Sequence, residues 1–421
     1  MIKNKNRSIF IIIFISGLIA LNLFFSIHFF GTNDVRAWIR SAGLTNEYGI
    51  VKGYYIYTMN YPPLSSVMLW VTGKIAGIKP SREWLNEYPT FIEAQNTYTP
   101  IKISIFIMYN LLALVVFYYL LKKKNYSFSK SILRTSWLYL NPAFIFVNSI
   151  FGYMDIYFVP FLLGSFMLLE SNLFFLSGAF FAISFLIKLL PIFLLPVFIA
   201  YFVSIKFNKF KIKILDDELS SFILGIVVVL IPTLGVFGFQ SMESVFDASA
   251  VHGGILSNGA TNLNYLLSTY FYPNNITPLL WLKWSKYLFY ILSAFYILTI
   301  SLKKKSIENI YLASIGIFLS YYILFTGVHE NHLFPALIPA LGLILNRFSK
   351  GNILIFINIS LIVFLNVFSS YGFGNILQNG IITQVFPPFF NQIKNLWRPM
   401  ISFYSTLYLI YYTYSFYKKT R

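Results

Sequence analysis

Long runs of apolar residues recur from one end of this chain to the other, and they constrain its fold more than any other feature. A run of about 20 apolar residues is long enough to cross the hydrocarbon core of a bilayer, which is about 30 Å thick. The runs are continuous and not alternating, and backbone amides inside lipid need partners within their own segment, so helices are predicted and not barrel strands. The chain is therefore predicted to be an all-α, polytopic membrane protein.

Basic residues cluster at the ends of these runs and predict how the spans are oriented, because short cytoplasmic loops collect Lys and Arg. The clusters expected to face the cytoplasm are Lys3, Lys5, Arg7, Lys122, Lys123, Lys124, Lys130, Lys206, Lys209, Lys211, Lys213, Lys303, Lys304, Lys305, Arg347, Lys350, Lys418, Lys419 and Arg421. With strict alternation, about twelve transmembrane helices are then predicted, at about 9–30, 100–121, 131–149, 153–170, 172–188, 189–205, 219–238, 283–302, 309–327, 333–346, 352–370 and 400–417.

The apolar stretch YPPLSSVMLWVTGKIAG, at 61–77, does not fit this alternation as a span, because it would place the lysines at 122–124 outside. Its two prolines suit the start of a helix, and Lys74 favours a helix that lies on the membrane surface. Residues 31–99 are therefore predicted to form one long external loop that carries an interfacial helix. No fixed-period repeat or linker divides the sequence, so residues 1–421 are expected to form a single domain.

The composition argues against several classes of function. The chain has no cysteine, so it forms neither a disulfide nor a thiolate metal site. Its formal charge of +18 is not arranged as a basic stripe on a soluble fold, which argues against nucleic acid as a partner. The histidines at 329 and 332 are only three residues apart, and no HExxH motif is present. No metal and no cofactor are therefore predicted.

Only 14 residues are Asp or Glu, so each can be considered by itself. Five fall on the predicted cytoplasmic side, Glu308 among them, and are expected to balance nearby lysines. A charge at membrane depth costs roughly 2.5–3.5 kcal/mol, so an acid just beyond a span end is a candidate functional residue. Asp34, in FGTNDVRAW, is such an acid. Either Asn33 or Asp34 caps a short helix that begins at Val35, or Asp34 is a general base for an acceptor hydroxyl, and the two roles are compatible.

Two further stretches place polar groups at the external ends of spans. Asp155, in SIFGYMDIYF, either caps and packs locally or accepts hydrogen bonds from sugar hydroxyls. In GVHENH, the side chains of His329 and His332 either reach water or meet an anionic phosphate, and Glu330 then holds the ring or tautomer of His329. Lys188, with apolar residues on both sides, either snorkels from a helix end or approaches a lipid phosphate.

Four segments resemble, in the same order, the membrane-embedded glycosyltransferases of the GT-C fold that take sugars from polyprenyl phosphates. They are NDVRAW, MNYPPLSSVML, LNPAFIFVNSIFGYMDIYF and GVHENHLFPALIPAL. The second and the fourth are similar to stretches of the dolichyl-phosphate-glucose glucosyltransferases, and the third is similar to bacterial and archaeal relatives. NGATNLNYLLS, at 258–268, is a weaker match. Two positions depart from the family: a glutamine is replaced in GYMD, and Asn331 stands where the glucosyltransferases have lysine.

The resemblance implies an inverting transfer of a hexose or pentose from a polyprenyl-phosphate-linked donor to a glycolipid or glycan acceptor. Asp34 would be the catalytic base, and contact with the donor phosphate would fall to His329, His332 or Arg36. The interfacial helix would wall the acceptor groove together with Tyr54, Tyr55, Tyr57 and Tyr61. We expect an integral membrane enzyme in the plasma membrane of a prokaryote rather than the endoplasmic reticulum, with its active site on the external or luminal side.

Three other classes of membrane protein remain as alternatives. A transporter or flippase of a lipid-linked substrate would place ionisable residues near the midplane and often contains internal repeats. A lipid-linked oligosaccharide polymerase or ligase would share the long external loops but use lipid diphosphate donors. An ion channel is the least favoured, because no filter-like segment or acidic ring is evident.

Overall fold

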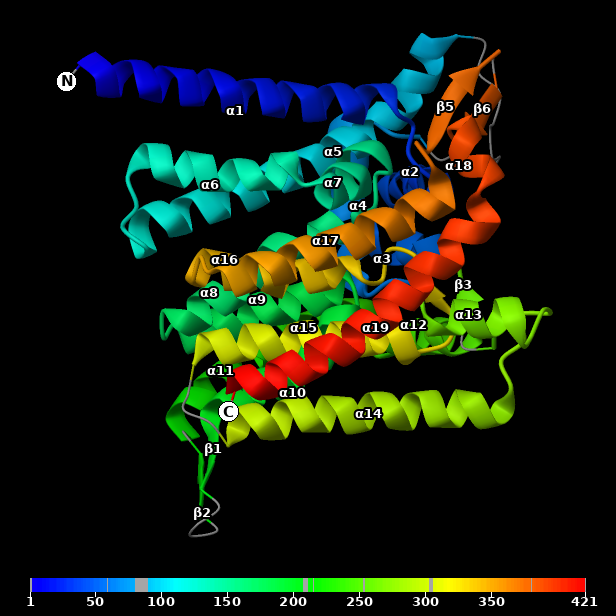
Figure 1. Cartoon of the computed structure of the whole chain (residues 1–421). Coiled ribbons are helices and arrows are strands. Elements are labelled where there is room, and N and C mark those ends of the chain that lie inside the picture. The colour runs from blue at the N-terminus through cyan, green and yellow to red at the C-terminus, as the bar shows by residue number, and fades with distance from the viewer. Residues whose placement is uncertain are drawn as a thin grey trace. The chain divides into compact units, whose positions relative to one another are not determined.

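The computed structural model describes residues 2–58, 60–79, 90–206, 211–214, 216–252, 254–302, 306–379 and 381–420. Residues 80–89 of the predicted loop and the basic residues Lys209, Lys303, Lys304, Lys305 and Arg421 lie outside these ranges. Most of the described chain is helical, and its strands form three short two-stranded sheets (Figure 1), so the predicted all-α class is confirmed. Contacts divide the chain into two compact units, which are described in turn.

The first unit comprises residues 1–58, 65–160 and 371–388. Its elements are α1 (Ile2–His28), α2 (Asn33–Tyr48), α3 (Ile50–Gly53), η1 (Tyr54–Thr58), most of α4 (Pro63–Ala76), α5 (Phe91–Tyr118), η2 (Tyr119–Lys123), α6 (Phe128–Leu140), α7 (Pro142–Phe144), η3 (Ile145–Ile150), η4 (Met154–Tyr157), β5 (Asn375–Gln378) and β6 (Ile381–Gln384). The two strands pair antiparallel, with Asn375 opposite Gln384.

A helix break divides the predicted span at 131–149. Helix α6 ends at Leu140, and the side chain of Asn141 then caps α7 by accepting a hydrogen bond from Ala143 N at 2.9 Å. Pro142 stands at the first position of α7, where its missing N–H costs nothing. A second break follows η3 at residues 151–153, where Gly152 adopts a φ of 70°.

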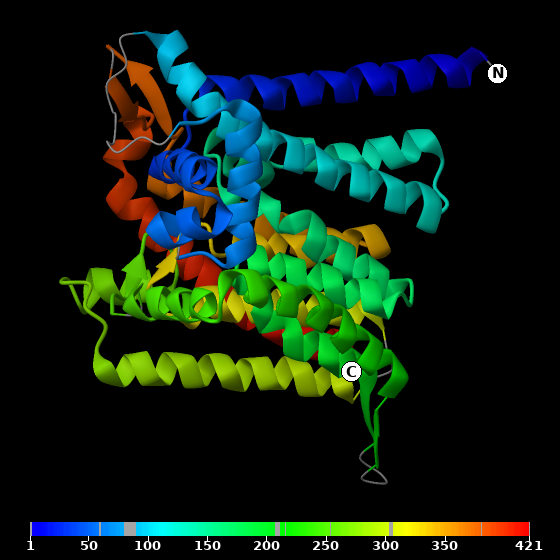
Figure 2. The same ribbon diagram turned by 180° about the vertical axis from the view of Figure 1, so that it is seen from behind.

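The second unit comprises residues 59–64, 161–370 and 389–421. Its elements are α8 (Val159–Glu170), α9 (Phe174–Ile187), η5 (Leu190–Leu194), α10 (Leu195–Phe202), β1 (Val203–Lys206), β2 (Lys211–Ile214), α11 (Asp216–Phe237), α12 (Gln240–His252), β3 (Ser257–Asn258), α13 (Leu263–Tyr270), α14 (Leu279–Ser301), α15 (Ile307–Leu324), β4 (Val328–His329), η7 (Phe334–Ala336), α16 (Leu337–Asn346), α17 (Lys350–Tyr371), α18 (Pro388–Gln392) and α19 (Lys394–Thr420). Helix α14 runs alongside α10 and α15 (Figures 1 and 2).

Small residues allow α9 and α11 to approach closely. A Cβ at Gly178 would meet the backbone carbonyl of Phe222, and a Cβ at Gly225 would meet that of Phe175. Membrane helices pack through such small residues because lipid supplies no hydrophobic force between them. The reciprocal glycine contacts therefore account for the tight packing of this helix pair.

Five described helices are long and apolar enough to cross a membrane: Phe10–His28, Phe91–Lys123, Asp217–Phe237, Ile307–Leu324 and Lys350–Tyr371. A sixth is added if Pro142–Ile150 and Met154–Glu170 form one broken span. The twelve predicted spans fall largely on helical residues, although the span predicted at 189–205 runs into β1. Three of them lie on apolar helices shorter than 18 residues, namely Phe174–Ile187, Leu190–Phe202 and Phe334–Asn346, and the helices at 283–302 and 400–417 are not among the membrane-length candidates. The number twelve stays a prediction. A helix is present as Pro63–Ala76, and its interfacial placement stays a prediction as well.

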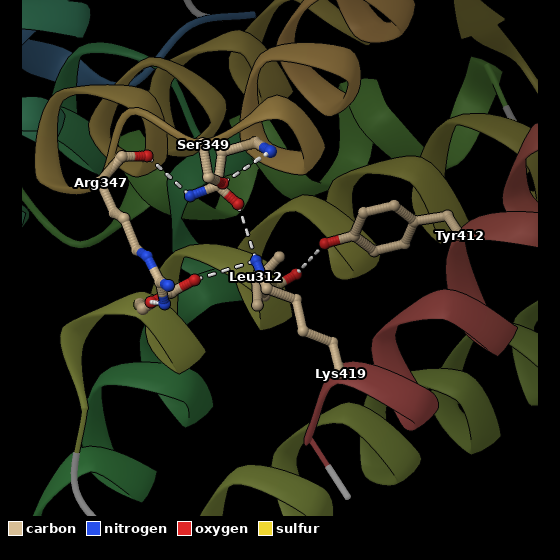
Figure 3. Close-up of polar contacts among 7 residues, drawn as sticks. Leu312, Arg347, Ser349, Tyr412 and Lys419 are labelled. Carbon is tan, nitrogen blue, oxygen red and sulfur yellow. Dashed lines mark hydrogen bonds and ion pairs between the residues drawn. The ribbon is translucent and has the colours of Figure 1, made fainter.

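A polar cluster in the second unit joins the start of α15, the start of α17 and the ends of α16 and α19 (Figure 3). The carboxylate of Glu308 lies 2.9 Å from Lys419 Nζ and 3.9 Å from an Arg347 nitrogen. Lys419 also donates to the side-chain oxygen of Asn352 at 2.7 Å. The prediction that Glu308 balances a nearby lysine is thus confirmed.

Candidate functional site

Helix α2 of the first unit presents the predicted catalytic acid in its first turn. The N-cap is Thr32, whose hydroxyl oxygen accepts from Asp34 N at 3.3 Å. The helix begins at Asn33, so the prediction that Asn33 or Asp34 caps a helix beginning at Val35 is wrong. Capping by Thr32 leaves the Asp34 carboxylate, which is half-buried, in the turn where the partial positive charge of a helix stabilises an anion.

Neighbouring backbone fixes the turn that leads into this helix. Gly31 has a φ of 81°, and a Cβ there would lie 2.5 Å from the Phe151 carbonyl oxygen. Thr32 N donates to that same oxygen at 3.0 Å, and Asn375 N donates to the Gly31 oxygen at 2.9 Å. Phe30 N donates in turn to the Asn375 oxygen at 3.0 Å. The start of α2 is therefore held by the break at 151–153 and by β5.

Arg36 and Arg40 of α2 each contact a tyrosine of the first unit. Arg36 Nε donates to the hydroxyl of Tyr98, which is buried, at 2.7 Å, and Arg40 lies 4.6 Å from the ring centre of Tyr57. Burial raises the pKa of the Tyr57 hydroxyl, Arg40 opposes this rise by its charge and a hydrogen bond, and the charge of Asp34 adds to it. Tyr57 is therefore a protonated hydroxyl within electrostatic reach of the Asp34 carboxylate.

Asp155 lies in η4, directly after the break at 151–153. It is only 2% exposed, and η4 has no side-chain cap. The structure thus places Asp155 in a short helix that follows the interruption at 151–153, and not at the end of a long continuous helix. Buried carboxylates need hydrogen-bonding partners, which fits either of the predicted roles.

In the second unit, two of the segments that resemble the family lie side by side. Strands β3 and β4 pair in parallel, with Asn258 opposite His329. The Asn258 amide nitrogen is 2.9 Å from His329 Nε2. An amide nitrogen only donates, so Nε2 accepts, and the proton of a neutral His329 ring is assigned to Nδ1. Asn258 therefore contacts one ring nitrogen of His329, and the predicted role of Glu330 in holding that ring or its tautomer stays a prediction.

His332 folds back onto the same turn. Its Nδ1 accepts from His329 N at 3.4 Å and lies 3.3 Å from the Tyr321 hydroxyl. The two imidazole rings meet edge to face, with centroids 5.1 Å apart. The structure therefore brings the two predicted histidines together, and both are half-buried.

Glu330 and Asn331, in contrast, are buried, at 4% and 6% exposure. A Cβ at Gly259 would lie 2.7 Å from a Glu330 carboxylate oxygen, so the glycine makes room for the carboxylate. Asn366 of α17 donates to the Glu330 carbonyl and accepts from Thr261 at 2.7 Å. This single amide fixes the ends of both β3 and β4.

Arg398, which the sequence analysis did not select, belongs to this cluster. Its Nη2 donates to the Gly259 carbonyl at 2.8 Å, and its guanidinium lies 4.6 Å from the ring centre of Tyr265. Burial, with the charge of Arg398 adding, lowers the pKa of Lys394 one turn earlier in α19. No local pattern in the sequence marked Arg398, because its partners Gly259 and Tyr265 lie more than 130 positions earlier in the chain.

The remaining predicted residues lie at helix junctions. Lys188 is the C-cap of α9 and is 8% exposed, so most of its side chain is covered by protein, and both of its predicted roles stay predictions. Tyr61 is half-buried in the bend before α4.

The long apolar helices indicate an integral membrane protein. Its polar groups gather at helix ends, with an acid in the first turn of α2 and a cluster of histidines with Arg398. Residues 36–250 match the model of the ALG6, ALG8 glycosyltransferase family, and this match covers more than half of the chain. The chain belongs to that family and is a membrane glycosyltransferase that uses a lipid-linked donor. No curated protein matches it. The expected resemblance is confirmed, and the transporter alternative is set aside.

Proposed function

We propose that the protein is an inverting glycosyltransferase that moves a hexose or pentose from a polyprenyl phosphate to a hydroxyl group of a glycolipid or glycan. The observation that carries this proposal is the placement of Asp34, because Thr32 caps α2 and Asp34 occupies its first turn. The half-buried carboxylate lies close enough to Tyr57 for its charge to raise the pKa of that hydroxyl, and a carboxylate held in position in this way can act as a general base.

The chemistry needs one carboxylate on the acceptor side. Asp34 takes the proton of the acceptor hydroxyl while its oxygen attacks the anomeric carbon, and the carbon–oxygen bond to the phosphate breaks on the opposite face. The phosphate leaves as a weak base and needs no proton from an acid. Attack opposite the leaving group inverts the anomeric configuration.

The cluster of the second unit is proposed to bind the donor phosphate. His329 offers Nδ1–H, since Asn258 holds its Nε2. His332 and Arg398 add further donors, and a guanidinium is well suited to phosphate oxygens. Such donors stabilise the charge that grows on the phosphate as the bond breaks.

The other predicted residues are given binding roles. Asp155 accepts hydrogen bonds from hydroxyls of the sugar, and Glu330 supports the turn between the histidines. Lys188 approaches the lipid phosphate from within the bundle. Arg36 would do so only through nitrogens other than Nε, which Tyr98 occupies. Tyr61 lines the acceptor groove.

Transfer by the purified protein from a panel of short-chain polyprenyl-phosphate sugars tests the donor class, and the anomeric configuration of the product tests inversion. We expect transfer from at least one donor, with inverted configuration. Retained configuration would overturn the one-carboxylate mechanism. Folded protein that transfers from none of the donors would overturn the donor class.

The proposed external face is tested separately, since a chain without cysteine accepts single labelling sites. Glu93 and Lys122 are both exposed. In intact cells, Glu93→Cys should react with a membrane-impermeant maleimide, and Lys122→Cys should react only after permeabilisation. The reverse pattern would place the site on the cytoplasmic side. The proposed site of the reaction is the external face of the plasma membrane of a prokaryote.

A further inference from the structure

Helix α5 carries a fully buried lysine that the proposed mechanism does not use. Lys102 is 0% exposed, and its Nζ donates to the carbonyls of Ser149 and Ile150 at 2.6 and 2.7 Å. These residues end η3. The last carbonyls of a helix lack partners within the helix and carry a partial negative charge. The lysine therefore caps the end of η3, which lies inside the protein because the helix is interrupted at 151–153.

The capped helix end leads directly to the turn before the proposed base. Phe151, the next residue, accepts the hydrogen bond from Thr32 N at 3.0 Å, and Thr32 caps α2. Gly152 packs between the lysine and the first turn of α2, since a Cβ there would lie 2.9 Å from Lys102 Cδ and 2.9 Å from Val35 Cγ2. Val35 is the neighbour of Asp34. Displacement of the break would therefore displace the start of α2.

The same break also precedes Asp155, which is buried. Tyr153 N donates to the Val147 carbonyl at 3.0 Å, and η4 with Asp155 begins at Met154. Lys102 thus contacts a break that is linked to both acids. Asp155 follows the break in sequence, and Asp34 is connected to it through the hydrogen bond from Thr32 N to the Phe151 carbonyl.

We propose that Lys102 is a positioning residue for the transfer reaction: by capping η3 it fixes the Phe151 carbonyl, and through Thr32 the orientation of Asp34. This inference rests on the proposed role of Asp34 as base. Burying a lysine is costly, and an apolar side chain of similar length would serve an ordinary helix interface better. The two carbonyls at the break explain why a lysine is needed here.

Steady-state transfer from a polyprenyl-phosphate sugar by purified Lys102→Met protein tests the proposal. We expect kcat to fall about 10–100-fold, because a misplacement of 1 Å can cost about 10²-fold. KM for the donor should stay the same, and Lys102→Arg, which keeps the donors, should recover most of the rate. Lys130→Met is the matched control, since Lys130 is an exposed lysine of the same unit whose Nζ lies 4.0 Å from the ring centre of Tyr126. It should leave kcat unchanged.

Repeating the Lys102→Met change in Asp34→Asn protein distinguishes a positioning role, which acts through Asp34, from a merely structural one. If the lysine acts through the base, it should lower the residual rate no further. An equal loss in both backgrounds, or a loss of folded protein with kcat per folded molecule unchanged, would overturn the inference. If Lys102→Met does not fold, Lys102→Gln replaces it in both backgrounds with the same expectations. A full rate for Asp34→Asn alone would overturn the proposed base and the positioning role with it.

Discussion

Replacement of Gly31 by alanine tests how tightly the turn before α2 is held. The residue has a φ of 81°, and the new Cβ would lie 2.5 Å from both the Phe151 carbonyl oxygen and Val35 Cγ2. The positive φ alone costs roughly 1–2 kcal/mol. Overpacking costs roughly 1–3 kcal/mol more, since the carbonyl is itself hydrogen-bonded to Thr32 and cannot easily withdraw. We therefore expect a total loss of stability of about 2–5 kcal/mol.

Two other glycines provide matched controls. Gly49 has a φ of 84° but nothing within 4 Å of its Cβ position, so Gly49→Ala should cost only the backbone term, about 1–2 kcal/mol. Gly17 lies inside α1 with open space around it, so Gly17→Ala should stabilise by about 0.5–1 kcal/mol.

Thermal unfolding of the purified proteins in one detergent gives the comparison. The midpoints should rise in the order Gly31→Ala, Gly49→Ala, wild type, Gly17→Ala. A midpoint for Gly31→Ala at or above that of Gly49→Ala would refute the claim that the turn is closely packed against the break.

Three further substitutions test the rest of the account. Asn258→Leu removes the partner of His329 Nε2 and should lower kcat/KM for the donor about 3–10-fold, the equivalent of one hydrogen bond; an unchanged value would exclude a role for the tautomer. Arg398→Lys keeps the charge but loses the planar fork, and should weaken donor binding about 10-fold in a KM measurement, whereas an equal KM would remove Arg398 from the donor site. Glu308→Gln breaks an ion pair with Lys419, whose side chain is 38% exposed, and should change stability by about 1 kcal/mol or less while transfer continues; lost transfer would contradict this purely structural role.

The helices were the most predictable part of the fold. Apolar runs of membrane length determine where helices form, and the predicted spans fall largely on helical residues. The interruption at Asn141 and Pro142 was visible in the sequence as an Asn-Pro pair, but the span at 131–149 was drawn through it. Proline can end one helix and start the next, and it is itself apolar. The apolar run therefore continues through the position where the helix is interrupted.

The details of the candidate site were less predictable, because they depend on competition between neighbours and on distant contacts. Thr32, Asn33 and Asp34 are all good N-cap residues, and the choice of Thr32 goes with a backbone turn that distant residues hold through hydrogen bonds. Arg398 reaches Gly259 across 139 positions of the chain. Lys102 lies inside a predicted span, where no local pattern indicates that its amine meets the end of another helix.

The most direct test of the central claim compares Asp34→Asn with wild type in transfer from the polyprenyl-phosphate sugar that the wild-type enzyme uses. Glu47→Gln is the control, since Glu47 is an exposed carboxylate on the same helix. If Asp34 is the base, Asp34→Asn should lose about 10²–10⁴-fold in kcat, the usual contribution of positioned proton transfer, while the folded protein unfolds at the wild-type temperature and Glu47→Gln transfers normally. An Asp34→Asn enzyme as active as Glu47→Gln would contradict the account.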